Sequence, residues 1–134
     1  MKLDLSSLQK AVASLGRAVV RSQGDTADEE IRDAVIQRFE YTYELCWKML
    51  KRHVESVAAS PAEIDQMSFK ELMRDAAERG LVLDVEPWFE YRRQRNRTSH
   101  AYDAEAARSV YETALAFHGG ALALLGELER RNGG

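Results

Sequence analysis

Apolar residues recur every three or four positions along most of this chain. The first such stripe, from Leu5 to Val19, predicts an amphipathic helix that ends near Arg21. The second, from Ile36 to Val57, is widened by further apolar residues and predicts a long central helix with neighbours on more than one side. Only 2 prolines, 31% charged residues and long stretches without glycine agree with this pattern, so the expected fold class is all-α.

Local signals place the expected boundaries of the middle helices. Thr26-Ala27-Asp28-Glu29 has the form of a capping box and predicts the start of the second helix, and Ala58-Ala59-Ser60-Pro61 predicts its end. The chain could restart as a helix at Ser60 or at Ser68, since both begin capping-box patterns. We favour Ser68, because the segment from Leu72 to Gly80 then forms a short apolar face with a glycine at its end.

The last two helices are expected to begin at aspartates. Asp84 is the predicted cap of the fourth helix and Asp103 that of the fifth. The fifth carries an apolar stripe from Ala107 to Leu128, has its weak point at Gly119-Gly120, and is expected to fray over residues 130–134. The chain is therefore predicted to be one domain, residues 1–134, that folds as an up-and-down bundle of four main helices with one additional short helix.

Composition limits where such a protein works. The formal net charge of -3 argues against broad, nonspecific binding of nucleic acid, although a focused site remains compatible with it. The single cysteine, Cys46, cannot form an intramolecular disulfide, and no Cys/His cluster has the spacing of zinc ligands, so no metal or cofactor is expected. Residues Met1 to Leu5 include an acid where a signal peptide would be apolar, and no apolar stretch approaches the roughly 18 residues of a membrane span. We expect a cytoplasmic protein with no membrane partner.

The segment from Tyr91 to Tyr102 reverses the charge of the chain, with four arginines and no acid. This reversal suggests a partner that carries phosphate. His100 is the best general acid or base here, because an imidazole exchanges protons near neutral pH. Arg95 presents a planar fork of donors that suits a phosphodiester, and Asn96 adds a neutral donor and acceptor that could orient the scissile group.

Helical geometry constrains how these groups could act together. On one helix Arg95 and His100 would diverge by about 140°, so they share a site only if the helix ends between them or a second subunit supplies one of them. The other candidate residues are expected to contact a substrate or partner. They are Arg92, Arg97 and Ser99 of the same segment, together with Glu40 and Glu44, whose spacing on one helix face makes them partners for arginines.

Two blocks of the sequence resemble a known family. Arg95-Asn96-x-x-x-His100-x-Tyr102 fits the R-x4-H-x-Y signature of HEPN domains of the HepT kind. With Thr98 and Ser99 before the histidine, the segment is more similar to the branch called nucleotidyltransferase substrate-binding proteins. The residues from Arg32 to Lys48 are similar to the long second helix of that branch, so the resemblance covers nearly the whole chain.

The resemblance implies a small helical homodimer that works with a minimal nucleotidyltransferase of the MNT type, in a toxin-antitoxin arrangement. The preferred hypothesis is an accessory subunit that binds a nucleotide or another substrate for that transferase. The alternative is a metal-independent ribonuclease toxin that uses Arg95, Asn96 and His100 on RNA and is silenced by AMPylation of Tyr102. A third hypothesis, which needs only the bundle, is a helical interaction module without a ligand. Thr98 and Ser99 depart from the HepT pattern, which puts ribonuclease activity in more doubt than fold or partnership.

Overall fold

The computed structural model describes residues 2–133, which form α-helices and one short 3-10 turn. This result confirms the all-α fold class. In chain order the elements are α1 (Ser6–Gly24), α2 (Glu29–Val57), α3 (Pro61–Asp65), α4 (Phe69–Glu78), α5 (Glu86–Arg95), η1 (Thr98–His100) and α6 (Ala104–Gly133).

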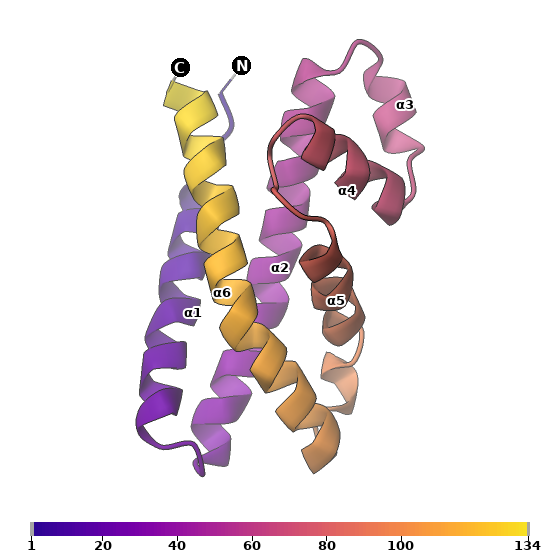
Figure 1. The fold of residues 1–134 in the computed structure, drawn as a ribbon. Coiled ribbons are helices and arrows are strands. Elements are labelled where there is room, and N and C mark those ends of the chain that lie inside the picture. The colour runs from indigo at the N-terminus through magenta and orange to yellow at the C-terminus, as the bar shows by residue number, and fades with distance from the viewer. Residues whose placement is uncertain (1, 134) are drawn as a thin grey trace.

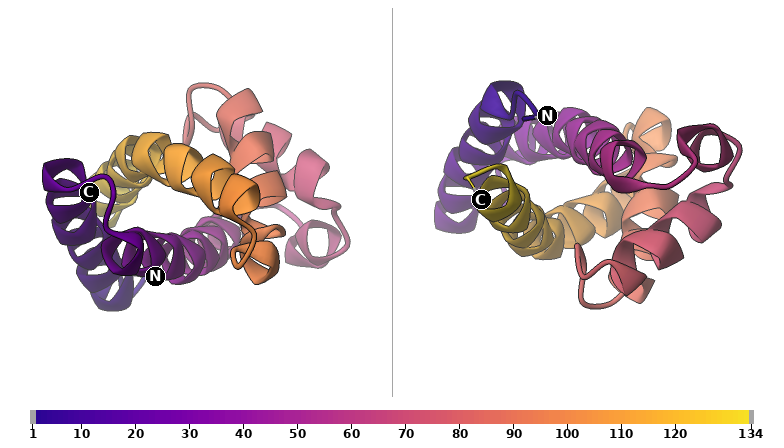
Figure 2. Two further views of the ribbon diagram at one scale, coloured as in Figure 1. Left: turned by 90° about the horizontal axis from the view of Figure 1, so that it is seen from below. Right: turned by 90° about the horizontal axis from the view of Figure 1, so that it is seen from above.

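Three long helices, α1, α2 and α6, run side by side, and α5 packs against α2 and α6 as the fourth member of the bundle (Figure 1). The two ends of the chain lie at the same end of the molecule (Figure 1). The short helices α3 and α4 fold back beside the C-terminal half of α2, outside the bundle, as the end-on views also show (Figure 2). The connection from α4 to α5 therefore delivers the arginine-rich segment to one side of the bundle.

The centre of the core is a group of aromatic rings around Phe117 of α6. The rings of Phe39, Trp88 and Tyr91 lie 5.1, 6.0 and 5.0 Å from the Phe117 ring, all edge to face, which is the favoured geometry for aromatic pairs. Phe39 comes from α2, and Trp88 and Tyr91 come from α5. These contacts fix the position of α5 and therefore of the residues that follow it.

The observed helix starts correct some of the predicted caps. The cap of α2 is Asp28 and not Thr26: its carboxylate accepts hydrogen bonds from the backbone N–H groups of Glu30 and Ile31, at 2.9 and 3.2 Å. Asp84 accepts a hydrogen bond from the backbone N–H of Glu86, but the capping position itself is one residue later. An aspartate directly before the first turn meets the free N–H groups best, which explains why Asp28 prevails.

The other predicted starts agree with the structure. Ser68 forms a complete capping box with Glu71 at the start of α4. The alternative restart at Ser60 is also used, because Pro61 opens the single turn of α3. Asp103 accepts a hydrogen bond from the N–H of Ala106 at 3.0 Å and begins α6 as predicted.

The predicted fraying of residues 130–134 is wrong for its described part, because α6 continues to Gly133. Arg131 donates a 2.6 Å hydrogen bond to the backbone carbonyl of Arg79. The side-chain amide of Asn132 both accepts from the backbone N–H of Leu3, at 3.1 Å, and donates to its carbonyl, at 2.8 Å. These long-range bonds hold the last turn; Gly134 lies outside the described residues.

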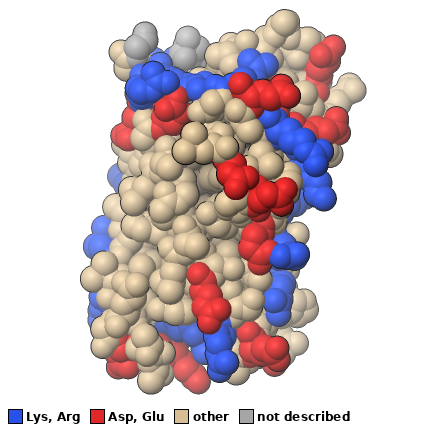
Figure 3. Space-filling view, in the orientation of Figure 1, with Lys and Arg blue, Asp and Glu red and all other residues tan. Residues whose placement is uncertain are grey.

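In the view of Figure 3 a broad uncharged area covers the left part of the face, and acidic side chains follow one another down the middle and right of it. No helix within residues 2–133 combines the length and the apolar character needed to cross a membrane.

Candidate functional site

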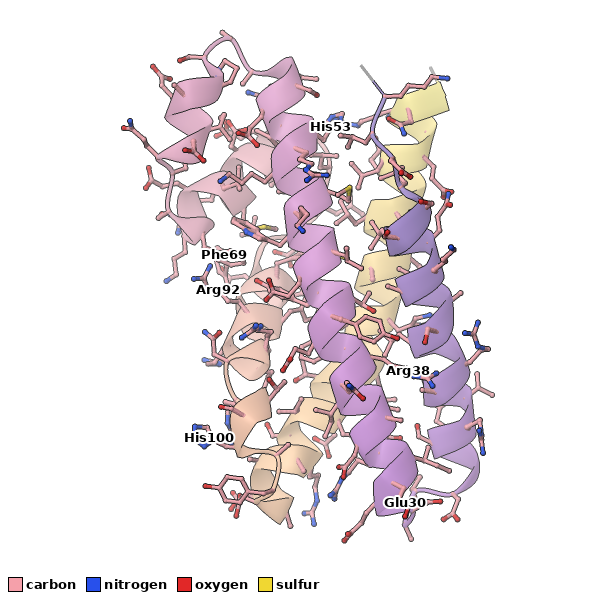
Figure 4. All side chains as sticks on the ribbon, turned by 180° about the vertical axis from the view of Figure 1, so that it is seen from behind. Glu30, Arg38, His53, Phe69, Arg92 and His100 are labelled. Carbon is pink, nitrogen blue, oxygen red and sulfur yellow. The ribbon has the colours of Figure 1, made fainter. Side chains whose placement is uncertain are left out.

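The helix that carries the arginines ends between Arg95 and His100. Arg95 is the last residue of α5, Asn96 is its C-cap, and the chain then turns through η1 before α6 begins. The divergence of about 140° expected on one continuous helix therefore does not apply to these two residues. Figure 4 shows Arg92 and His100 along the same edge of the molecule.

A hollow of about 250 Å³ lies between α2 and α5. Within it the Nε atom of Arg95 lies 2.7 Å from a carboxylate oxygen of Glu44, which confirms Glu44 as a partner of a motif arginine. The lining residues are Tyr43, Glu44, Trp47, Arg92, Arg95 and Asn96. The structure thus brings together four of the predicted site residues, Glu44, Arg92, Arg95 and Asn96.

Glu40 has a different partner from the one expected. Its carboxylate accepts a hydrogen bond from the hydroxyl of Thr98 and is paired with no arginine among the residues described. The same hydroxyl lies 2.9 Å from the backbone carbonyl of Arg95. Because a hydroxyl carries one proton, Thr98 donates to one of these acceptors at a time, and it connects α2 to the turn that carries His100. The sequence reading missed this role, although a threonine three residues after a helix-terminal carbonyl is a known local signal.

His100 and Tyr102 lie outside the hollow, at the surface. Their rings are 6.3 Å apart, centroid to centroid, and 88% of Tyr102 is exposed. Neither side chain makes a hydrogen bond to another residue in the part of the chain that the structure describes. Ser99, the residue before His100, is exposed as well.

The remaining predicted arginines point in different directions. The guanidinium carbon of Arg92 lies 4.4 Å from the centre of the Phe69 ring, at the border of the hollow. Arg97 instead donates a 3.3 Å hydrogen bond to the hydroxyl of Ser109 on α6. Arg97 therefore does not join Arg92 and Arg95 in this protomer.

The two aromatic residues of the hollow have both a packing role and a site role. Tyr43 is buried, and this burial raises the pKa of its hydroxyl, so the group is neutral at physiological pH. Trp47 is half-buried and packs its ring 5.0 Å from that of Phe69. Both residues therefore contribute to packing and also border the hollow. The neighbouring Tyr41 bonds to Ser14 instead.

This arrangement suits a phosphate-bearing ligand. Arg92 and Arg95 offer charged donors, Asn96 offers an amide, and Trp47 offers an aromatic surface to a base. The carboxylate of Glu44 reduces the positive charge of the hollow. The affinity for a phosphate-bearing ligand should therefore depend on how many of the Arg95 N–H groups stay bonded to Glu44 and how many bond to the ligand.

Comparison with known proteins agrees with the pattern in the sequence. A family model for proteins described as nucleotidyltransferase substrate binding protein like matches residues 3–130. A relative from Haemophilus influenzae named "Probable ribonuclease HepT" is 37% identical, over 98% of this chain and 95% of its own length. A solved structure from Haemophilus influenzae, reported to reveal the fold of a substrate binding domain of a nucleotidyltransferase, has a TM-score of 0.89 and 34% identity, over 94% of this chain and 99% of that one. The chain therefore belongs to the nucleotidyltransferase substrate binding protein-like family.

Proposed function

We propose that this chain is a metal-independent endoribonuclease that works as a homodimer with a separate MNT-type nucleotidyltransferase, in a toxin-antitoxin pair. The observation that carries the proposal is the free imidazole of His100, which no described side chain binds, a few residues beyond a hollow with two arginines. An exposed imidazole that no described side chain occupies is available to a substrate. The similarity to a protein named as a probable ribonuclease supports the same reaction.

The chemistry requires one proton to be removed and one to be supplied. The ribose 2′-oxygen loses its proton and attacks the adjacent phosphorus, the bond from phosphorus to the 5′-oxygen breaks, and that oxygen gains a proton. His100 of one protomer would act as the base and His100 of the other as the acid. Arg95 would stabilise the added negative charge on the phosphate oxygens, and Asn96 would orient the scissile group.

The position of Thr98 supports the ribonuclease proposal. Thr98 departs from the HepT pattern, but its hydroxyl is directed inward, to Glu40 and to the carbonyl of Arg95. The Thr98 hydroxyl therefore stabilises the turn, and it does not point to the surface where His100 would meet the substrate. This position favours the ribonuclease over the accessory subunit as the proposed function.

Tyr102 is the proposed point of control. Its phenol is 88% exposed and its ring lies 6.3 Å from that of His100. The companion transferase would join the phenol oxygen to the α-phosphorus of ATP, release pyrophosphate, and leave AMP on Tyr102. The added bulk and negative charge would block the approach of RNA to His100.

The test is incubation of the purified protein with RNA in EDTA. Wild-type protein should cleave the RNA to products with 2′,3′-cyclic phosphate ends, and His100→Ala should lose cleavage with an unchanged melting temperature and unchanged RNA affinity. RNA that stays intact with the wild-type dimer would overturn the proposal. Intact-mass measurement after treatment with the companion transferase and ATP should show added AMP on the wild type and none on Tyr102→Phe.

The second candidate function is the accessory subunit that binds a nucleotide for the transferase. The hollow favours it, because Trp47 and the pair Arg92 and Arg95 could hold a base and its phosphates without any reaction. The solved structure reported as a substrate binding domain of a nucleotidyltransferase supports it too. Nucleotides that raise the melting temperature of a protein that never cleaves RNA would favour this function.

A further inference from the structure

Three aromatic rings form a row that starts at the hollow and leads away from it. Trp47 of α2 borders the hollow, Phe69 of α4 follows with its ring 5.0 Å away, and Phe89 of α5 follows with its ring 6.1 Å from that of Phe69. All three side chains are half-buried, so each keeps part of its surface in solvent. The row therefore differs from the core rings around Phe117, which are buried.

Cationic groups lie over this row. The Arg92 guanidinium is 4.4 Å from the centre of the Phe69 ring, and Lys70 and Arg74 lie 5.6 and 5.9 Å from that of Phe89. Each of these three cations is exposed. None has a carboxylate oxygen within 4.0 Å in the described part of the chain.

The nearby carboxylates are already engaged elsewhere. Glu90 pairs with Arg93, Asp75 pairs with Arg79 at 2.7 Å, and Glu71 closes the capping box of α4. The cations of the row are thus left free in a protein whose net charge is -3. Free cations over half-buried rings are the combination that single-stranded nucleic acid requires, since the cations follow the backbone and the rings stack on bases.

Arg92 and Phe69 together offer a platform. The guanidinium lies over the ring, and the Arg92 side chain is exposed. Arginine planes stack on nucleobases as aromatic rings do, so a base can lie on Arg92 without displacing it. Figure 4 shows Phe69, Arg92 and His100 in succession along one edge, so a strand on this platform would continue toward the motif.

We propose that Trp47, Phe69, Phe89, Lys70, Arg74 and Arg92 form a track that binds single-stranded RNA on one side of the cleavage position. The inference rests on the proposed function, because it names the part of the substrate that the hollow and His100 do not reach. The track predicts a preference for unpaired RNA that is long enough to extend from His100 to Phe89.

The test compares RNA lengths in a His100→Ala background, which prevents cleavage. Fluorescent single-stranded RNA of about four and about twelve nucleotides would be titrated against Lys70→Ala/Arg74→Ala, with Lys10→Ala/Arg17→Ala on α1 as the matched control for charge. The first double variant should bind the longer RNA about tenfold more weakly, with a salt slope reduced by about 1.4 for two lost phosphate contacts. The shorter RNA and the control variant should be unaffected. Circular dichroism would confirm that both variants fold.

Equal affinity and equal salt slope in the two double variants would overturn the track. It would also fail if Lys70→Ala/Arg74→Ala lost binding to the companion transferase while RNA affinity stayed the same, because the surface would then be a protein interface. The proposed function is tested separately, by cleavage of the short RNA in the His100 wild-type background. If the short RNA is cleaved but Lys70→Ala/Arg74→Ala binds the longer RNA as well as its parent does, the track alone is rejected. If the short RNA is not cleaved, the proposed function is rejected.

Discussion

The Nε atom of Arg95, the last residue of α5, lies 2.7 Å from a carboxylate oxygen of Glu44 in the middle of α2. The side chains of the two residues are 35% and 49% exposed, so the ion pair itself adds at most about 1 kcal/mol of stability. Its greater effect is on the hollow. The carboxylate occupies one edge of the guanidinium fork and places negative charge where a phosphate would bind.

Glu44→Gln should therefore raise the affinity for RNA by about two- to fivefold at low salt. Glutamine keeps the size and a carbonyl oxygen for Arg95, while the charge that repels the phosphate is gone. Fluorescence titration of a short RNA against the His100→Ala protein, with and without this change, measures the effect. Weaker binding would contradict the prediction and would show that the carboxylate is needed to hold Arg95 in place.

Thr98→Val should loosen the turn that carries His100. The change keeps the branched shape but removes the hydroxyl that lies between Glu40 and the carbonyl of Arg95. We expect the free energy of unfolding to fall by about 1 kcal/mol and cleavage to slow by about tenfold, because His100 is positioned less well. Thr98→Ser keeps the hydroxyl and is the control. Urea denaturation and RNA cleavage of both variants check the prediction, and equal effects of the two changes would refute it.

Much of the fold could be predicted because its pattern is local. The three-four spacing in α1, α2 and α6 depends only on which residues are apolar, and the capping box at Ser68 is contained within four residues. The prediction for the end of α6 is wrong because a distant contact decides it. The end of α6 is held by bonds from Asn132 to Leu3 and from Arg131 to the carbonyl of Arg79, and no local pattern reveals residues so far apart in the chain.

The candidate site was predictable in its residue types but less so in its pairings. The spacing of Glu40 and Glu44 on one helix face predicts arginine partners, and Glu44 meets Arg95. Glu40 is one turn earlier on the same helix and meets Thr98 instead. Arg95 is the last residue of α5 and Thr98 lies in the turn after it, so the two glutamates meet different parts of the chain.

The two adjacent glycines of α6 should respond oppositely to alanine. A Cβ atom on Gly120 would lie 2.8 Å from the hydroxyl oxygen of Tyr91, whose ring is held against Trp88 and Phe117, whereas a Cβ on Gly119 would meet nothing within 4 Å. Gly119→Ala should therefore stabilise the protein by up to about 1 kcal/mol, through helix propensity. Gly120→Ala should destabilise it by about 1 to 2 kcal/mol. Thermal unfolding of the two variants measures both signs, and equal stabilisation by both would show that Tyr91 can move aside.

The imidazole of His53, near the end of α2, faces cations from two other elements. Its Nε2 atom lies 3.4 Å from a guanidinium nitrogen of Arg131 on α6, and Arg79 approaches from the end of α4. Burial lowers the pKa of His53 from its ordinary value of 6.5, both arginines lower it further, and Glu127 opposes them. The folded protein therefore favours neutral His53 more than the unfolded chain does.

This preference makes stability depend on pH in a defined direction. Well above pH 6.5 the imidazole is neutral in both states and the native arrangement keeps its full stability. As the pH falls through 6.5, the unfolded chain binds a proton that folded His53 resists, and stability is lost until the folded group also becomes protonated. The melting temperature should thus fall between about pH 7.5 and about pH 5.5, a window above the range in which carboxylates titrate. His53→Gln, which cannot take up that proton, should show a flatter profile by circular dichroism over the same window. A variant profile as steep as that of the wild type would place the pH dependence in another group.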